Sequence, residues 1–177
     1  MTAQTARRLV VLRHAKSAWP AMDDVDRPLA ERGRRDAPAS GRWLRSSGHP
    51  LDHVICSPAQ RTRETWELVS HELASAPQVD FDERVYAATG SELLEVIQET
   101  PDRVRTLLLV GHNPGVQDLT LFLAGSAADD ALTRAQEKFP TSAIAVLVLD
   151  DPWPTLLPGR ARLAEFVVPR GGARKRN

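Results

Sequence analysis

The feature that most constrains this chain is a short aliphatic run, Val10-Val11-Leu12, that ends abruptly at Arg13 and His14. A run this short and rich in β-branched residues is typical of a buried strand. In an open α/β sheet, ligands bind in the crevice outside the carboxyl ends of the strands. The run therefore predicts a sheet whose edge presents an arginine and a histidine to a ligand.

These two side chains have complementary chemistry. An imidazole can attack an electrophile or shuttle protons near neutral pH, and a guanidinium offers a rigid fork that matches the oxygens of a phosphate or a carboxylate. Arg13 and His14 together therefore predict chemistry on an anion. For the pair taken alone, the alternative is an arginine that caps a loop and a histidine that packs at a strand end.

Strand-like and helix-like patterns alternate along the rest of the chain. Further strands are expected at residues 52–56, 79–81, 106–110, 143–149 and 163–168. Helices are expected at residues 29–47, 57–73, 91–101, 115–123 and 128–138, with Ser57 and Ser91 as caps and Pro38 as a candidate kink. This order predicts a three-layer α/β/α sandwich on a largely parallel central sheet, in which the last strands can pair antiparallel.

Length and composition restrict the class of protein. The 177 residues, 42% of them hydrophobic, can bury one sizeable core, so we expect a single domain over 1–177, with its core at about 8–168 and a mobile basic tail over 171–177. The 23 basic and 23 acidic side chains cancel, so no overall field favours nucleic acid or an anionic membrane as partner. A single cysteine, Cys56, excludes an internal disulfide, and residues 1–8 lack a signal-peptide core, so we expect a cytoplasmic protein.

Unusual polar residues follow three separate strands. Arg13 and His14 follow the first, Arg61 lies just beyond the second, and His112 follows the run at 106–110. If these strands are parallel neighbours, two arginines and two imidazoles surround a space of the size of a phosphoryl group. The N-termini of the helices that come next would add backbone N–H donors for an anion. The arrangement predicts a phosphate pocket.

The segment between the first strand and the first helix has neither helical nor strand periodicity. Residues 17–28 hold two prolines, three aspartates and one tryptophan. Such a segment is typical of a loop that lies over the strand end. We expect it to form a lid or a wall of the pocket.

Four motifs occur in order along the chain: Leu12-Arg13-His14-Ala15-Lys16; Asp26-Arg27-Pro28-Leu29 with Glu31-Arg32-Gly33; Ser57-Pro58 with Arg61 and Thr65; and Val110-Gly111-His112-Asn113-Pro114. The set resembles the histidine phosphatase superfamily, and most closely its short SixA-type phosphohistidine phosphatases. This resemblance covers about residues 9–119. It implies a phosphoglycerate mutase-like fold, no metal or other cofactor, and a phosphohistidine intermediate on His14. It also implies that Arg13 and Arg61 bind phosphate oxygens and that His112 is the second pocket histidine.

Physical chemistry makes these roles coherent. A histidine that attacks phosphorus must be unprotonated at the attacking nitrogen, and neighbouring arginines disfavour the imidazolium. The same arginines stabilise charge on the oxygens of the transferred group. His112, once protonated by the anion beside it, can donate a hydrogen bond to those oxygens.

The leaving group needs a proton unless it is already a good one. Residues 82–86 resemble a segment of the mutase branch in which a glutamate acts as acid and base, so Glu83 is the candidate proton donor. The alternative is that Glu83 pairs with Arg84 or faces solvent.

The chain also departs from the mutase pattern. Pro20 stands where mutases have an asparagine that contacts phosphate, and the insertions that build a specificity cap in longer relatives are absent. We therefore expect an open pocket suited to phosphohistidine borne by a protein. The alternatives are hydrolysis of a small phosphomonoester, which depends on Glu83, and a non-catalytic pocket that only binds phosphorylated ligands.

Overall fold

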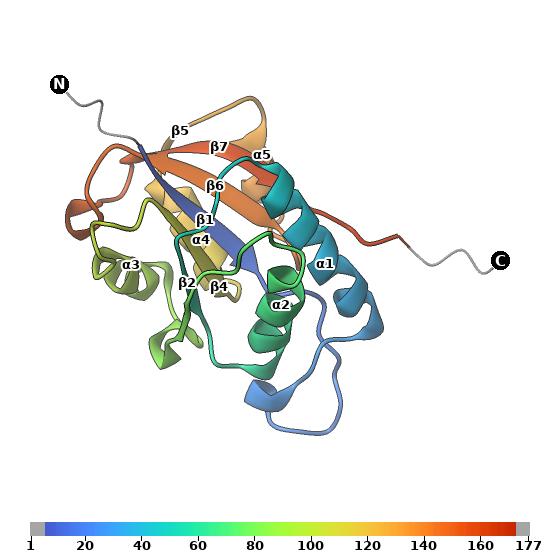
Figure 1. Cartoon of the computed structure of the whole chain (residues 1–177). Coiled ribbons are helices and arrows are strands. Elements are labelled where there is room, and N and C mark those ends of the chain that lie inside the picture. Colours follow the sequence, from blue (N-terminus) through green and yellow to red (C-terminus); the bar gives the residue numbers. More distant parts are fainter. Residues whose placement is uncertain (1–5, 173–177) are drawn as a thin grey trace.

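Residues 6–172, the part of the chain that the computed structural model describes, form a seven-stranded sheet between two layers of helices (Figure 1). The strands are β1 (Arg7–Arg13), β2 (His53–Cys56), β3 (Val79–Phe81), β4 (Thr106–Gly111), β5 (Ala124–Ala127), β6 (Ile144–Leu149) and β7 (Ala161–Val167). The helices are α1 (Glu31–Ser46), α2 (Gln60–Ser70), α3 (Gly90–Gln98), α4 (Gly115–Leu123) and α5 (Ala131–Glu137). Short 3-10 turns lie at η1 (Asp24–Asp26), η2 (Glu83–Val85) and η3 (Trp153–Thr155).

The strand order across the sheet is β3-β2-β4-β1-β6-β7-β5. β1 pairs parallel with β4, and β2 pairs parallel with both β4 and β3. β6 runs antiparallel to its neighbours β1 and β7. The predicted α/β/α sandwich on a largely parallel sheet is therefore confirmed, including the antiparallel pair near the end of the chain. The carboxyl ends of β1, β2 and β4 lie at one edge of the sheet.

The central strands are buried on both faces, which explains their continuous aliphatic sequences. In β1, Leu9 and Val11 pack on one face with side chains of α3, α4 and α5. Val10 and Leu12 pack on the other face, where Leu44 of α1 and side chains of α2 cover them. Burial of each such side chain contributes about 1.5–3 kcal/mol, so this strand is a rigid base for the residues that follow it.

One strand does not follow from the sequence pattern. Directly after α4, residues 124–127 form β5, which pairs parallel with β7 at the edge of the sheet. Its small residues have no period-two hydrophobic pattern, so its pairing depends on close backbone approach. A Cβ added at Gly125 would overlap the carbonyl oxygen of Gly159, which explains the need for glycine there.

Two helix starts also differ from the expectation. The N-cap of α2 is Ala59, and the hydroxyl of Ser57 lies before the helix in contact with the side chain of His112. The N-cap of α3 is Thr89, whose side chain forms a capping box with Glu92. The predicted caps Ser57 and Ser91 were therefore wrong, although both helices are present.

The last described residues are held against α1. The buried carboxylate of Asp36 accepts hydrogen bonds from the backbone N–H of Gly171 at 3.0 Å and from the guanidinium of Arg170 at 3.2 Å. Of the predicted basic tail, residues 173–177 lie outside the described residues. Between residues 6 and 172, no helix has the length and apolar character needed to cross a membrane.

Candidate active site

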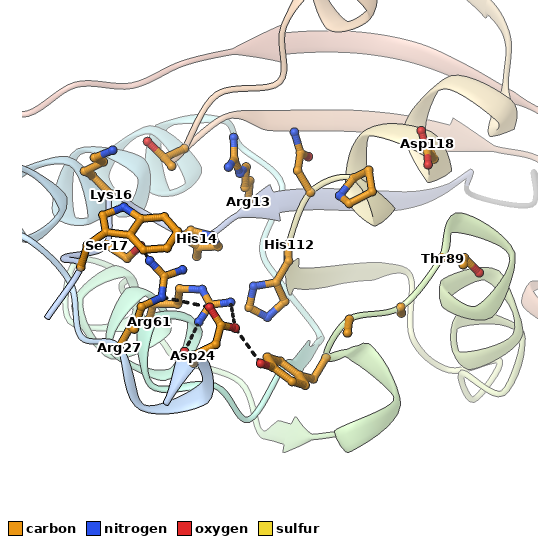
Figure 2. Close-up of a pocket in the computed structure, with 17 residues that line it drawn as sticks. Arg13, His14, Lys16, Ser17, Asp24, Arg27, Arg61, Thr89, His112 and Asp118 are labelled. Carbon is orange, nitrogen blue, oxygen red and sulfur yellow. Dashed lines mark hydrogen bonds and ion pairs between the residues drawn. The ribbon is translucent and has the colours of Figure 1, made fainter. Parts of the chain in front are cut away.

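The strand register brings the four predicted residues together. Arg13 pairs with Gly111 across β1 and β4, so the residues that follow, His14 and His112, are also neighbours. Their ring centroids are 5.3 Å apart. Arg61, in the first turn of α2, points toward the same place (Figure 2). Arg13, His14, Arg61 and His112 all line one cavity of about 530 Å³.

His14 is buried and its tautomer is fixed by the main chain. Its Nδ1 atom lies 2.7 Å from the carbonyl oxygen of Ala15. A carbonyl can only accept, so Nδ1 carries the ring proton and Nε2 keeps its lone pair. Burial lowers the pKa of His14 to about 3, helped by the charges of His112, Arg13 and Arg61 and opposed by the hydrogen bond to the Ala15 carbonyl. At neutral pH the ring is therefore uncharged, as a nucleophile requires.

Three buried nitrogens in this cavity lining have no hydrogen-bond partner among the described residues. They are Nε of Arg13, Nε of Arg61 and Nδ1 of His112. Leaving a buried donor unpaired costs roughly 1–3 kcal/mol. An oxyanion with several acceptor oxygens can satisfy such a set, and hydrogen bonds from guanidinium groups to an anion are among the stronger ones.

The orientation of His112 depends on a buried serine. Ser57 Oγ lies 2.7 Å from His112 Nε2 and accepts the backbone N–H of Ala59 at 3.3 Å. When the serine hydroxyl donates to Nε2, the ring proton of a neutral imidazole lies on Nδ1. Burial and, secondly, the charge of Arg61 lower the pKa of His112 to about 4, so the ring is uncharged at neutral pH, and in this tautomer Nδ1–H is its donor.

The loop from Ser17 to Pro28 forms one wall of the cavity. The backbone N–H of Ala18 donates to the carbonyl of Pro28 at 2.9 Å, which closes the base of the loop. Arg27 is buried, and its guanidinium donates to Ser17 Oγ at 3.2 Å. Because side-chain and backbone bonds hold both ends, this segment is a fixed wall in the structure.

Asp24, on η1 of that loop, reaches into the cavity (Figure 2). Its carboxylate accepts hydrogen bonds from Tyr86 Oη at 2.6 Å, from Arg27 Nε at 3.0 Å and from Arg61 at 3.1 Å. These bonds, with that from Tyr86 as the largest cause, lower the pKa of Asp24 to about 2. Asp24 is therefore a fixed anion that orients Arg61.

The structure does not bring Glu83 to the cavity. Asp82 is the N-cap of η2, and its side chain accepts a hydrogen bond from the backbone N–H of Arg84. Glu83, the first residue of η2, is exposed and absent from the cavity lining. Arg84 pairs with Asp82 and Glu99, so Glu83 faces solvent, as the alternative interpretation of this residue proposed. Tyr86 takes its place in the lining, with its ring edge-on to His112 at 5.6 Å.

Sequence reasoning missed several residues of the site. Arg27 belongs to a quoted motif but had no assigned role, and Ser57 was assigned to helix capping. Asp24 and Tyr86 meet from segments 62 residues apart, and no local pattern signals that contact.

The cavity lining carries four basic side chains, from Arg13, Lys16, Arg27 and Arg61, and two acidic ones, from Asp24 and Asp118. The chain is neutral overall, yet its cavity is locally positive.

Fold and site together define an α/β protein with a positively charged cavity beside an unprotonated histidine, an arrangement suited to a phosphate-sized anion. Residues 9–140 match the histidine phosphatase superfamily (branch 1), and the chain belongs to this superfamily. It is a phosphatase with the phosphoglycerate mutase-like fold.

Individual relatives agree with this assignment. The putative phosphohistidine phosphatase SixA from Nakamurella multipartitia is 30% identical in sequence, with a TM-score of 0.81 over 93% of this chain and 96% of that one. Phosphohistidine phosphatase SixA of Escherichia coli (strain K12) is 26% identical over 146 residues, 81% of this chain and 86% of its own length. An uncharacterized protein of Mycobacterium tuberculosis is 44% identical over 162 residues, 90% of this chain and all of that protein. These likenesses confirm the SixA-type resemblance.

Proposed function

We propose that this phosphatase removes the phosphoryl group from phosphohistidine borne by a protein, with His14 as the nucleophile and without a metal ion. The observation that carries the proposal is the state of His14. Its Nδ1–H is held by the Ala15 carbonyl at 2.7 Å, and its pKa of about 3 leaves Nε2 unprotonated at neutral pH. A neutral imidazole beside two arginines is suited to attack phosphorus.

The proposed reaction has two displacements. In the first, the Nε2 lone pair of His14 forms a bond to phosphorus while the P–N bond of the substrate breaks. The leaving imidazole nitrogen keeps the bonding pair and departs as neutral imidazole, because the substrate ring carries a proton on its other nitrogen. In the second, a water oxygen bonds to phosphorus, the bond to Nε2 breaks, and the water proton passes to solvent.

Arg13, Arg61 and His112 supply the donors for the phosphoryl oxygens in this proposal. Their buried nitrogens without partners are the groups that an oxyanion would satisfy. Removal of one donor from a preorganised site of this kind typically lowers turnover by about a hundredfold to a thousandfold. The fixed carboxylate of Asp24 keeps Arg61 in place for this task.

The acidic residues of the cavity favour a phosphohistidine substrate. An alkyl phosphate leaves as an alkoxide and needs an acid, whereas imidazole is a far better leaving group. The lining has two carboxyl groups among the described residues. Asp24 has a pKa of about 2 and is tied to Tyr86 and two arginines, and Asp118 is exposed on α4. Neither is an acid matched to an alkoxide.

The proposal is tested by comparing substrates in chelator-containing buffer. The full chain is expected to hydrolyse a phosphohistidine protein and phosphoramidate with a kcat/KM at least about a hundredfold above that for alkyl phosphomonoesters. His14→Ala should abolish hydrolysis of the phosphohistidine protein and of phosphoramidate. His71→Ala, which alters an exposed histidine at the end of α2, should retain both activities.

Two results would count against this assignment. Hydrolysis of alkyl esters at a rate equal to that of phosphohistidine would make a small phosphomonoester the better candidate. Loss of activity in chelator would reject the metal-free chemistry. Glu83→Gln serves as a check on the proton donor, because a selective loss of ester hydrolysis in this variant would return the acid role to Glu83 despite its position outside the cavity.

A further inference from the structure

Exposed apolar side chains gather beside the cavity. Among residues 6–172, five large hydrophobic side chains are exposed, and three of them lie on the loop that forms the cavity wall. These three, here called the apolar rim, are Trp19, Met22 and Val25, which are 77%, 48% and 37% exposed. Trp19 lines the cavity, while Met22 and Val25 lie on the same loop outside the cavity lining. Clustered exposed apolar side chains of this kind mark interaction sites.

The apolar rim is held in a fixed position. The guanidinium of Arg27 lies 3.6 Å from the centre of the Trp19 ring, and its Nε donates to Asp24. Asp24 in turn is bound to Arg61 and Tyr86, so η1, which carries Val25, is attached to the cavity wall. Little freedom of the Trp19 ring and of η1 remains to be lost when a partner binds, which favours binding.

The charges around the rim restrict the partner. Asp23 and Asp26 flank Val25 on the same loop, both are exposed, and neither has an ion-pair partner within the described part of the chain. Aspartates at this place repel an anionic membrane or a nucleic acid. They attract lysine and arginine side chains, which steer and orient a protein partner.

We propose that the apolar rim docks the protein that carries the phosphorylated residue, by contacting an apolar side chain that lies next to basic ones on the surface of that protein. The proposal rests on the proposed function, because it assigns the leaving group to a protein. A phosphate ester of a small molecule would fill the cavity but would not extend to Met22 and Val25, which lie outside its lining.

The test separates docking from chemistry. The double variant Met22→Ser/Val25→Ser is compared with Leu157→Ser, which alters an exposed leucine (58% exposed) remote in sequence from the loop. Substrates are a phosphohistidine peptide with neighbouring leucine and lysine, and phosphoramidate. We expect the double variant to raise KM for the peptide by at least about tenfold at unchanged kcat. Phosphoramidate turnover should stay within about twofold of the wild type, and Leu157→Ser should change neither.

Equal kinetics of the double variant and the wild type on the peptide would overturn the docking surface. Equal losses on the peptide and on phosphoramidate would do so too, since they would show damage to the cavity wall. Peptide selectivity gives a second readout that needs no variant. The wild type should prefer leucine and lysine neighbours over glycine and glutamate by about tenfold in KM, and no preference would reject the proposal.

The remaining outcomes test whether the partner is a protein or a membrane, and whether the proposed function itself holds. Co-sedimentation with anionic lipid vesicles that is lost in the double variant would replace the protein partner by a membrane. If the wild type turns over neither phosphoramidate nor any phosphohistidine substrate, the proposed function itself fails. If it turns over both and only the docking experiments fail, the proposed function stands and the docking surface is rejected.

Discussion

At the level of single residues, the site depends on which nitrogen of each histidine ring carries the proton. In His14 the Ala15 carbonyl holds the proton on Nδ1, and in His112 a hydrogen bond donated by the Ser57 hydroxyl to Nε2 would hold it on Nδ1 as well. The same tautomer therefore serves a different purpose in each ring. In the proposed reaction, His14 presents a lone pair on Nε2 to phosphorus, and His112 presents an N–H on Nδ1 to an oxygen.

This account predicts a specific effect for Ser57→Ala. Without the hydroxyl, Nε2 of His112 loses its donor and the ring proton is shared between both nitrogens. We expect kcat to fall by about tenfold to a hundredfold, because a donor in the oxyanion site is weakened. Nitrogen-15 NMR of the histidine rings should show loss of the Nδ1–H tautomer of His112. Ser57→Thr, which keeps a hydroxyl, should recover part of kcat and part of the NMR signal of that tautomer.

A matched control is Ser40→Ala, since Ser40 is equally buried but its hydroxyl donates to the carbonyl of Ser142 and touches no histidine. It should keep wild-type kcat and the wild-type NMR signature. A Ser57→Ala variant that behaves like this control would refute the role of Ser57.

At the level of elements, α1 determines where the segment that follows His14 lies. Gly33, in the first turn of α1, packs directly against the main chain of Lys16. The backbone N–H of Ala30 donates to the Lys16 carbonyl at 2.9 Å, and Thr65 of α2 accepts the N–H of Ala15 at 3.0 Å. Helices α1 and α2 thus hold residues 15 and 16 behind His14.

Gly33→Ala is expected to disturb this packing. A Cβ at position 33 would overlap the carbonyl oxygen of Lys16, and main-chain atoms cannot move aside as a flexible side chain can. We expect a loss of about 1–3 kcal/mol in the free energy of unfolding and a clear fall in kcat. Urea unfolding and steady-state kinetics measure both. Gly172→Ala, where a Cβ meets no atom within 4 Å, should change neither, and equal stability of the two variants would contradict the packing argument.

Most elements could be predicted because their signals are local. The aliphatic run of β4 and the apolar spacing of α4 lie within single short windows, and both match the predicted limits to within a residue. β5 could not be predicted, because its small residues pair with β7 only through tertiary contacts. The caps also differ from the prediction. α2 begins after Ala59, with the Ser57 hydroxyl in contact with His112, and the capping box of α3 is formed by Thr89, two residues before Ser91.

At the level of the whole molecule, folding converts a neutral chain into one with a local excess of positive charge. This excess follows from the parallel order of β2, β4 and β1, which gathers three strand ends at one edge of the sheet. The positions of Arg13, His14, Arg61 and His112 were predictable because each lies at or shortly after the carboxyl end of a strand. Asp24 and Tyr86 were not, because loops place them, and η2 directs Glu83 to solvent.

The buried histidines make stability depend on pH. Burial lowers the pKa of His14 to about 3 and that of His112 to about 4, below their ordinary value of 6.5. Between pH 6.5 and these values the unfolded chain binds more protons than the folded one, so the free energy of unfolding falls as the pH falls. From pH 7 to pH 5 we expect a loss on the order of 2 kcal/mol for each histidine.

Urea unfolding at pH 7 and pH 5 in phosphate-free buffer measures this loss. His14→Ala should remove about half of the pH dependence that the two histidines cause, and His71→Ala, at an exposed position, should leave it in place. A wild-type stability that is the same at pH 5 and pH 7 would show that the two rings are not held neutral by burial.

The central claim is that His14 forms a covalent bond to phosphorus, and trapping that bond tests it most directly. The full chain is mixed briefly with an isotopically labelled phosphodonor and quenched in alkali, in which phosphohistidine is stable, and the label is located by peptide mass spectrometry. The account predicts label on His14 and none in His14→Ala. A wild-type protein that binds phosphate but never carries label on His14, or that carries it on another residue, would contradict the account and favour a pocket that only binds phosphorylated ligands.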